Sequence, residues 1–284
     1  MNRHEALKKI ALEVQSGALH FPTHAQAGFK LKQALDDPDC HVDAAARLVQ
    51  ADPLLAAQIV AIANSVAYNP SGREILDVKT AVSRLGFSTL RSIVMARVTR
   101  QIAGTSASPE VQQMTAQLWE HTTHVAALAR VIAKRITGQT PEVAFFAGIV
   151  HEVGGFYLLA RSADWPHLLD PVAVGSGDTV DEAREVEQGV CAAVLKRLEV
   201  PSAIVEAIEE YGRGYLAMPP RTLADTLMLA DYLAPIASPL WKAKNTAPLA
   251  EQASLDLSID DQTLSEILAE SAGEVASLAA ALRG

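Results

Sequence analysis

Hydrophobic residues recur along most of the chain at intervals of three or four, the spacing of one helix face, and the alternation typical of strands is hard to find. Asp52-Pro53 predicts a helix start, because aspartate can cap free amides and proline is tolerated in the first turn. One buried stripe should follow, formed by Leu55, Ile59, Ile62 and Val66. A further helix is predicted from about Thr80 to Val98. The pattern therefore predicts an all-α fold.

The second half of the chain repeats this pattern behind two more proline-containing helix starts. Ser108-Pro109 begins a predicted helix whose buried stripe comprises Met114, Leu118, His121, Val125, Leu128 and Ile132. Thr140-Pro141 begins the helix that delivers His151 and Glu152. After a loop predicted at about 170–179, helices resume near Asp181, Pro201 and Thr222, and a final one runs from about Asp260 to Leu282.

Residues 104–109 are small and polar, which makes them the best boundary between two helical parts. We therefore predict an N-terminal part over residues 1–105 and a second part over residues 106–284. With 284 residues, 49% of them hydrophobic, the chain can bury a sizeable core in one large domain or two smaller ones.

Charge and cysteine content narrow the function classes. The chain has 24 Lys and Arg residues against 33 Asp and Glu, a formal charge of -9, which argues against nucleic acid as a partner. Two cysteines imply no disulfide framework and favour a reducing compartment. The N-terminus lacks the apolar core of a signal peptide, and no run approaches the roughly 18 apolar residues of a membrane span. We expect a cytoplasmic protein that does not enter a membrane.

His151 and Glu152 stand at the end of the apolar run 143–150, and an imidazole beside a carboxylate in such a segment indicates a metal site or the remains of one. A zinc-protease helix would need a second histidine four positions after the first. Position 155 is glycine, so that interpretation fails.

Four residues from three predicted helices form a different candidate site: His121, His151, Glu152 and Asp231. Each lies on or beside an apolar face, and two imidazoles with two carboxylates would suit Zn, Mn, Fe or Mg. Taken singly, His121 is also explained as a core histidine bonded to a backbone carbonyl, and Asp231 as a capped or paired core carboxylate. Both interpretations stay open on the residues alone.

Other residues with reactive side chains have simpler explanations. His124 is expected to be a partly exposed residue at the flank of its helix stripe, and Cys191 a small core residue without an activating base. The sequence contains no phosphate-binding loop, dinucleotide-binding glycine pattern or serine nucleophile elbow.

Several separated motifs, taken together, resemble the HDOD domain, a bacterial signalling module related to the HD phosphohydrolases. The first half contains an Asp-Pro start followed by an apolar helix and Asn64-Ser65, and then an alanine followed by Leu85-Gly86. The second half contains Leu118-Trp119, and Gly148-Ile-Val-His151-Glu152-Val-Gly154 stands where the family has Gly-Leu-Leu-His-Asp-Ile-Gly. The resemblance covers the chain from about Phe21 to about Asp231.

The resemblance implies an N-terminal helical bundle packed on a divergent HD-like helical bundle. It also implies that His121, His151, Glu152 and Asp231 match the metal quartet of catalytic HD enzymes. Glutamate replaces aspartate in the eponymous pair, and one extra methylene moves a carboxylate by about 1.5 Å, more than the roughly 0.5 Å tolerance of a working site. Three further positions depart from residues common in the family: Glu187, the Tyr211-Gly212 pair and Leu198.

These departures favour a non-catalytic signalling or scaffold protein that acts through protein-protein contacts, with the quartet as a vestigial metal site and no catalytic residue. Its expected partners are signalling proteins, and either a monomer or a homodimer is compatible with the sequence. No cofactor is expected, although a divalent ion would fit. The alternatives are a metal-dependent HD-type phosphohydrolase acting on a nucleotide or cyclic dinucleotide, and a module that binds a nucleotide without turnover.

Overall fold

The part of the chain that the structure describes is mainly helical, as predicted. The computed structural model describes residues 3–16, 23–104, 106, 108–169, 180–217, 219–240, 258–259 and 262–283. The predicted loop at 170–179 lies outside the described residues. Only four residues of the described chain are in strands, in the antiparallel pair β1 (Ser258–Ile259) and β2 (Gln262–Thr263).

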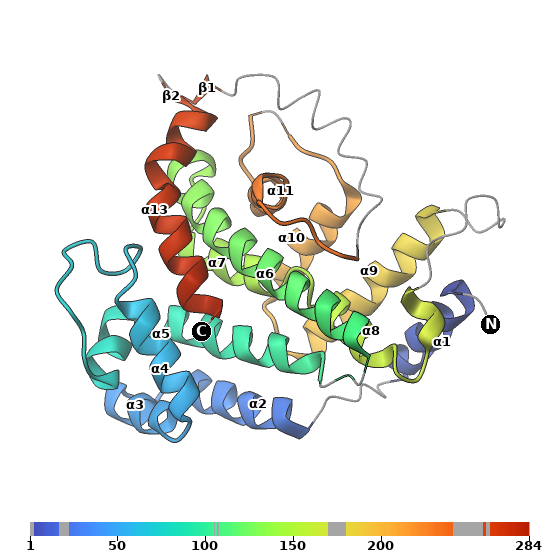
Figure 1. The fold of residues 1–284 in the computed structure, drawn as a ribbon, viewed down its shortest axis with the longest axis horizontal. Coiled ribbons are helices and arrows are strands. Elements are labelled where there is room, and N and C mark those ends of the chain that lie inside the picture. The colour runs from blue at the N-terminus through green and yellow to red at the C-terminus, as the bar shows by residue number, and fades with distance from the viewer. Residues whose placement is uncertain are drawn as a thin grey trace.

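Five helices make up the first part of the chain: α1 (Arg3–Gln15), α2 (Thr23–Asp36), α3 (Val42–Gln50), α4 (Pro53–Ala63) and α5 (Val78–Ile102). The helices α2, α3 and α4 all pack on α5. Gly86 bends α5, because its φ of +73° belongs to the left-handed region that favours glycine. The helix α1 packs instead on α9, in the second part of the chain (Figure 1).

The second part consists of α6 (Pro109–Ile132), α7 (Pro141–Val150), α8 (Val153–Arg161), α9 (Val180–Arg197), α10 (Ser202–Arg213), α11 (Leu223–Leu233) and α13 (Leu264–Arg283), with short helical turns η1 (Ala133–Thr137) and η2 (Pro166–Leu169). The long helix α6 crosses the molecule, and α7, α11 and α13 pack along it (Figure 1). The helix α5 also contacts α7 and α8, so the first part packs directly on the second.

The helix starts follow the predicted chemistry. The Asp52 carboxylate accepts the backbone N–H groups of Leu54 and Leu55, and Ser108 caps α6. The buried stripes also follow the prediction, except at Met114, which is only partly buried, and at Val66. The prediction for Val66 was wrong: its side chain is 53% exposed, because α4 ends at Ala63, before this residue is reached.

Residues 141–161, which span α7 and α8, are by length and composition apolar enough to cross a membrane, and they are the one such stretch in the described residues. The protein itself buries 83% of the apolar window. Packing against α5, α6 and α9 therefore accounts for the hydropathy of this stretch.

Candidate metal centre

Two glycines of the motif around His151 let its helices approach their neighbours closely. A Cβ on Gly148 would lie 2.6 Å from the Ala126 Cα of α6, and a Cβ on Gly154 would lie 2.8 Å from the Cys191 Cα of α9. Both distances are shorter than the 3.5–4.0 Å or so that separates carbon atoms in contact. These positions therefore require glycine, and the close packing fixes where His151 lies relative to α6 and α9.

This packing brings together side chains from three helices. One ligand atom from each of His121, His151 and Asp231 lies within 4.8 Å of the other two. The His121 Nε2 is 3.2 Å from the Asp231 Oδ1 and 3.7 Å from the Glu152 Oε2. Of the four predicted residues, three converge, and Glu152 borders them through its contact with His121.

Backbone carbonyls orient both histidines. The Nδ1 of His121 lies 2.7 Å from the Ile236 carbonyl, and the Nδ1 of His151 lies 2.8 Å from the Gly148 carbonyl. A carbonyl only accepts, so each Nδ1 must carry a proton and donate. In a neutral imidazole the Nε2 is then the basic nitrogen, and this is the arrangement typical of metal-binding histidines.

The cluster is buried and negatively charged. The exposed fraction is 0% for His121, 3% for His151 and 4% for Glu152. Burial lowers the pKa of the His121 imidazole, but the hydrogen bond to Asp231 and the negative charges of Glu152 and Asp231 outweigh it, so the pKa lies above its ordinary value of 6.5. Without an ion, a protonated His121 would balance part of the carboxylate charge.

Tyr211 of α10 closes one side of the cluster. Its hydroxyl donates to the Asp231 Oδ2 at 2.9 Å, and its ring stands edge-on to the His151 ring, with centroids 5.8 Å apart. The sequence marks Tyr211 only as a departure from the family. Its contact with Asp231 joins residues 20 positions apart on different helices, and no spacing rule predicts that contact.

Glu187, a second departure, is held by α1. The Arg3 guanidinium lies 2.5 Å from the Glu187 carboxylate, which is buried. Burial raises the pKa of Glu187, and the positive charge of Arg3 opposes that rise. The contact joins residues 184 positions apart, and no local pattern predicts it.

The simpler explanations for His124 and Cys191 agree with the structure. His124 is partly buried, and its Nδ1 bonds to the Glu120 carbonyl of its own helix at 2.8 Å. The Cys191 thiol lies 3.7 Å from the His151 carbonyl, and burial raises its pKa to about 12. A thiol with this pKa is not a nucleophile at neutral pH.

The donor set fits a divalent ion. Two imidazole nitrogens and a carboxylate oxygen, each histidine oriented by a second hydrogen bond, suit the ions Zn, Mn and Fe. The residues that would hold the ion are His121, His151 and Asp231, with Glu152 beside them. A bound divalent ion at such a site supplies Lewis acidity toward a phosphoryl oxygen.

One protein-family model matches most of the chain. The HDOD domain model matches residues 21–212, a range that includes His121, His151 and Glu152 and ends before Asp231. No curated protein matches the chain at a significant level.

Three solved structures share the fold over the whole length of this chain. A putative metal-dependent phosphohydrolase from Shewanella amazonensis SB2B is 20% identical, with a TM-score of 0.71 and 99% of each chain covered. An HDOD domain protein of unknown function from Geobacter sulfurreducens is 22% identical, with a TM-score of 0.59 and 98% of this chain and 97% of the other covered. A putative signal transduction protein from Marinobacter aquaeolei VT8 is 18% identical, with a TM-score of 0.58 and 100% of this chain and 67% of the other covered.

Proposed function

Because this chain belongs to the HDOD domain family, we propose that it is a non-catalytic signalling protein that acts through protein-protein contacts. One observation carries the proposal: most of the histidine-carboxylate cluster is buried. Its histidines and Glu152 are at least 96% buried, and Tyr211 donates a hydrogen bond to Asp231, whose side chain is 15% exposed.

Hydrolysis at such a cluster would require a substrate oxygen and a water to reach the same position. The Tyr211 hydroxyl already donates a hydrogen bond to the Asp231 Oδ2, and the Tyr211 ring lies edge-on to the His151 ring. A substrate that bound through this oxygen would have to displace the Tyr211 side chain and break its hydrogen bond. The arrangement suits a buried polar core better than a site for turnover.

Glu152 supports the same proposal. Its carboxylate reaches His121 at 3.7 Å but does not join the three-residue cluster. A catalytic metal site with four protein ligands needs each ligand within about 0.5 Å of its productive position. The longer glutamate side chain is compatible with a charge partner for His121 and less suited to a fourth ligand.

We further propose that the protein binds other signalling proteins or a second copy of itself in the cytoplasm. We also propose that it does not bind nucleic acid. The acidic balance supports the last point, since binding to a phosphate backbone needs an excess of positive charge. Of the similar structures, the Marinobacter aquaeolei protein is named for signal transduction, which agrees with this role.

The test measures metal and turnover in the same preparation of the full chain. Metal content is determined after purification, and phosphatase and phosphodiesterase activity is screened with Mn, Mg and Fe. We expect no turnover above the background of a His151→Ala variant, and a protein partner recovered by pull-down.

The matched control is His124→Ala, which removes a histidine of α6 whose Nδ1 bonds to the Glu120 carbonyl of the same helix. Stoichiometric metal with turnover that is abolished in His151→Ala and retained in His124→Ala would refute the non-catalytic proposal.

A metal-dependent phosphohydrolase acting on a nucleotide or cyclic dinucleotide is the second candidate. The convergence of His121, His151 and Asp231 within 4.8 Å favours it, and the Shewanella amazonensis relative carries that name. The same experiment separates the two, because only this candidate predicts activity that depends on His151.

A further inference from the structure

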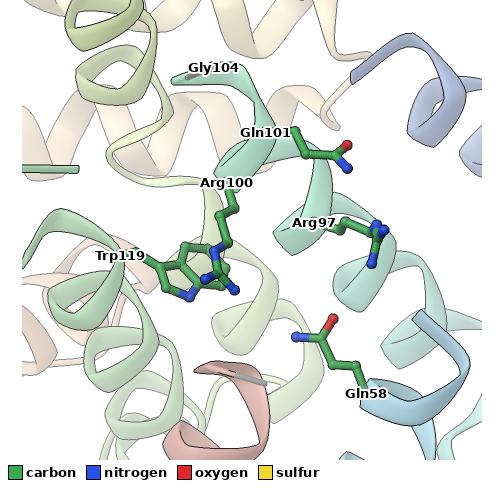
Figure 2. Close-up of a pocket in the computed structure, with 6 residues that line it drawn as sticks. All are labelled: Gln58, Arg97, Arg100, Gln101, Gly104 and Trp119. Atoms are coloured by element: carbon green, nitrogen blue, oxygen red, sulfur yellow. The ribbon is translucent and has the colours of Figure 1, made fainter. Parts of the chain in front are cut away.

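A second pocket lies apart from the candidate metal centre, where α4, α5 and α6 meet (Figure 2). It has a volume of about 280 Å³ and is lined by Gln58, Arg97, Arg100, Gln101, Gly104 and Trp119. A neighbouring hollow of about 410 Å³ shares Arg100, Gly104 and Trp119 and extends to Arg283 of α13. Together the two hollows offer space for a small molecule.

The wall of this pocket contains a buried donor that needs an acceptor. The Trp119 side chain is only 5% exposed, and its indole N–H has no hydrogen-bond partner in the part of the chain that the structure describes. Buried N–H groups in proteins are nearly always paired, so this one calls for an acceptor such as a water, an ion or a ligand. The motif residue Trp119 precedes the metal-site candidate His121 by two positions but has no part in that cluster.

Arg100 supplies a positive charge beside this donor. Its guanidinium lies 5.5 Å from the centroid of the Trp119 ring, and its Nη1 donates to the Arg283 carbonyl at 3.1 Å. Figure 2 shows the guanidinium against the indole. Among the described residues no carboxylate forms an ion pair with Arg100, whereas Arg97 is paired with Asp52 at 2.8 Å.

The other charged groups of the pocket are balanced. Arg283 is paired with Glu120 at 2.9 Å, and the Gln58 amide donates to the Leu282 carbonyl at 2.8 Å. Among the described residues that line the two hollows, Arg100 is therefore the cation without an ion pair, and it lies beside an indole N–H that also lacks an acceptor. An anion rich in acceptor oxygens satisfies both groups.

We propose that this pocket binds a phosphorylated small molecule of about mononucleotide size. A phosphate offers several acceptors, and a guanidinium binds it through charge-assisted hydrogen bonds. The remainder of the ligand extends along the neighbouring hollow toward Arg283. The site contains no residue of the histidine cluster, so this proposal stands or falls independently of catalysis there.

The test follows the Trp119 indole directly. The chain has three tryptophans, so an NMR spectrum of the full protein contains three indole N–H resonances, and a Trp119→Phe variant assigns the one of interest. We titrate with AMP, inorganic phosphate and adenosine. We expect saturable displacement of the Trp119 resonance by AMP, weaker binding of inorganic phosphate, and no response to adenosine.

Arg100→Gln should weaken the binding of AMP by about tenfold or more, because it removes the charged donor. The control is Arg47→Gln, which removes an exposed arginine of α3 and should leave binding unchanged. The proposal is overturned if no probe shifts the Trp119 resonance, if adenosine binds as well as AMP, or if both arginine variants weaken binding equally.

Discussion

Gly148→Ala tests whether the close approach of α7 and α6 is required. The added Cβ would lie 2.6 Å from the Ala126 Cα and 3.0 Å from its backbone nitrogen, so α7 must move away by up to about 1 Å to reach normal contact. Overpacking of this kind costs about 1–3 kcal/mol, against a helix-propensity gain of about 1 kcal/mol. We expect a net loss of up to about 2 kcal/mol, or up to about 8 °C in Tm for a protein of this size.

Thermal and urea unfolding followed by circular dichroism measure the loss. The matched control is Gly189→Ala in α9, where an added Cβ meets nothing within 4 Å. That variant should gain about 0.5–1 kcal/mol, because alanine restricts the unfolded chain and favours the helix. If Gly148→Ala proves as stable as Gly189→Ala, the helices can separate freely, and the reasoning from close packing is refuted.

Three further predictions concern titration and reactivity. The pKa of His121 is raised in the folded protein, so in EDTA the protonated imidazole should stabilise the fold below pH 6.5. This stabilisation should be lost as the pH rises through the folded pKa, and urea unfolding across about pH 6 to 9 should show the fall in the free energy of unfolding. The fall should be smaller in Asp231→Asn. Asp225 accepts three backbone N–H groups, so Asp225→Ala should lower the free energy of unfolding by about 2–3 kcal/mol. Burial raises the pKa of Asp225, but these bonds lower it overall, so the contribution should be lost as pH falls through a folded pKa below 3.8. A variant whose free energy of unfolding falls toward acid pH as steeply as that of the wild type would contradict this. Burial raises the pKa of Cys191 to about 12, so near about pH 8 its thiol should be alkylated far more slowly than that of Cys40. Mass spectrometry of the native protein measures both rates, and equal rates would contradict the burial of Cys191.

Local chemistry made the helices predictable. Asp52 and Ser108 cap the helices whose starts they predicted, and the stripe through Leu118, His121 and Val125 is buried. These signals act between residues a few positions apart, so the sequence contains them in full. The one error in the first stripe is Val66, which lies beyond Asn64, the residue that caps the end of α4, and so does not share the helix face of the other three.

The arrangement of the candidate site was predictable only in part. The motif placed His151 and Glu152 together, the apolar helix faces made His121 and Asp231 candidates beside them, and the resemblance matched all four to a metal quartet. Neither could show that Glu152 borders the cluster while three other residues form it. The cap by Tyr211 depends on how α10 crosses α11, which is set by packing over the whole core.

The position of α13 has a consequence for the order of assembly during synthesis. It packs on α6 and α4, and its Leu282 and Arg283 carbonyls bond to Gln58 and Arg100. The pocket proposed to bind a phosphorylated ligand lies between α4, α5, α6 and α13, and all four helices are needed to complete it. The helix α13 leaves the ribosome after the other three. A nascent chain stalled before residue 264 would fold its earlier helices around an open, incomplete pocket, so ligand binding would report that α13 has docked.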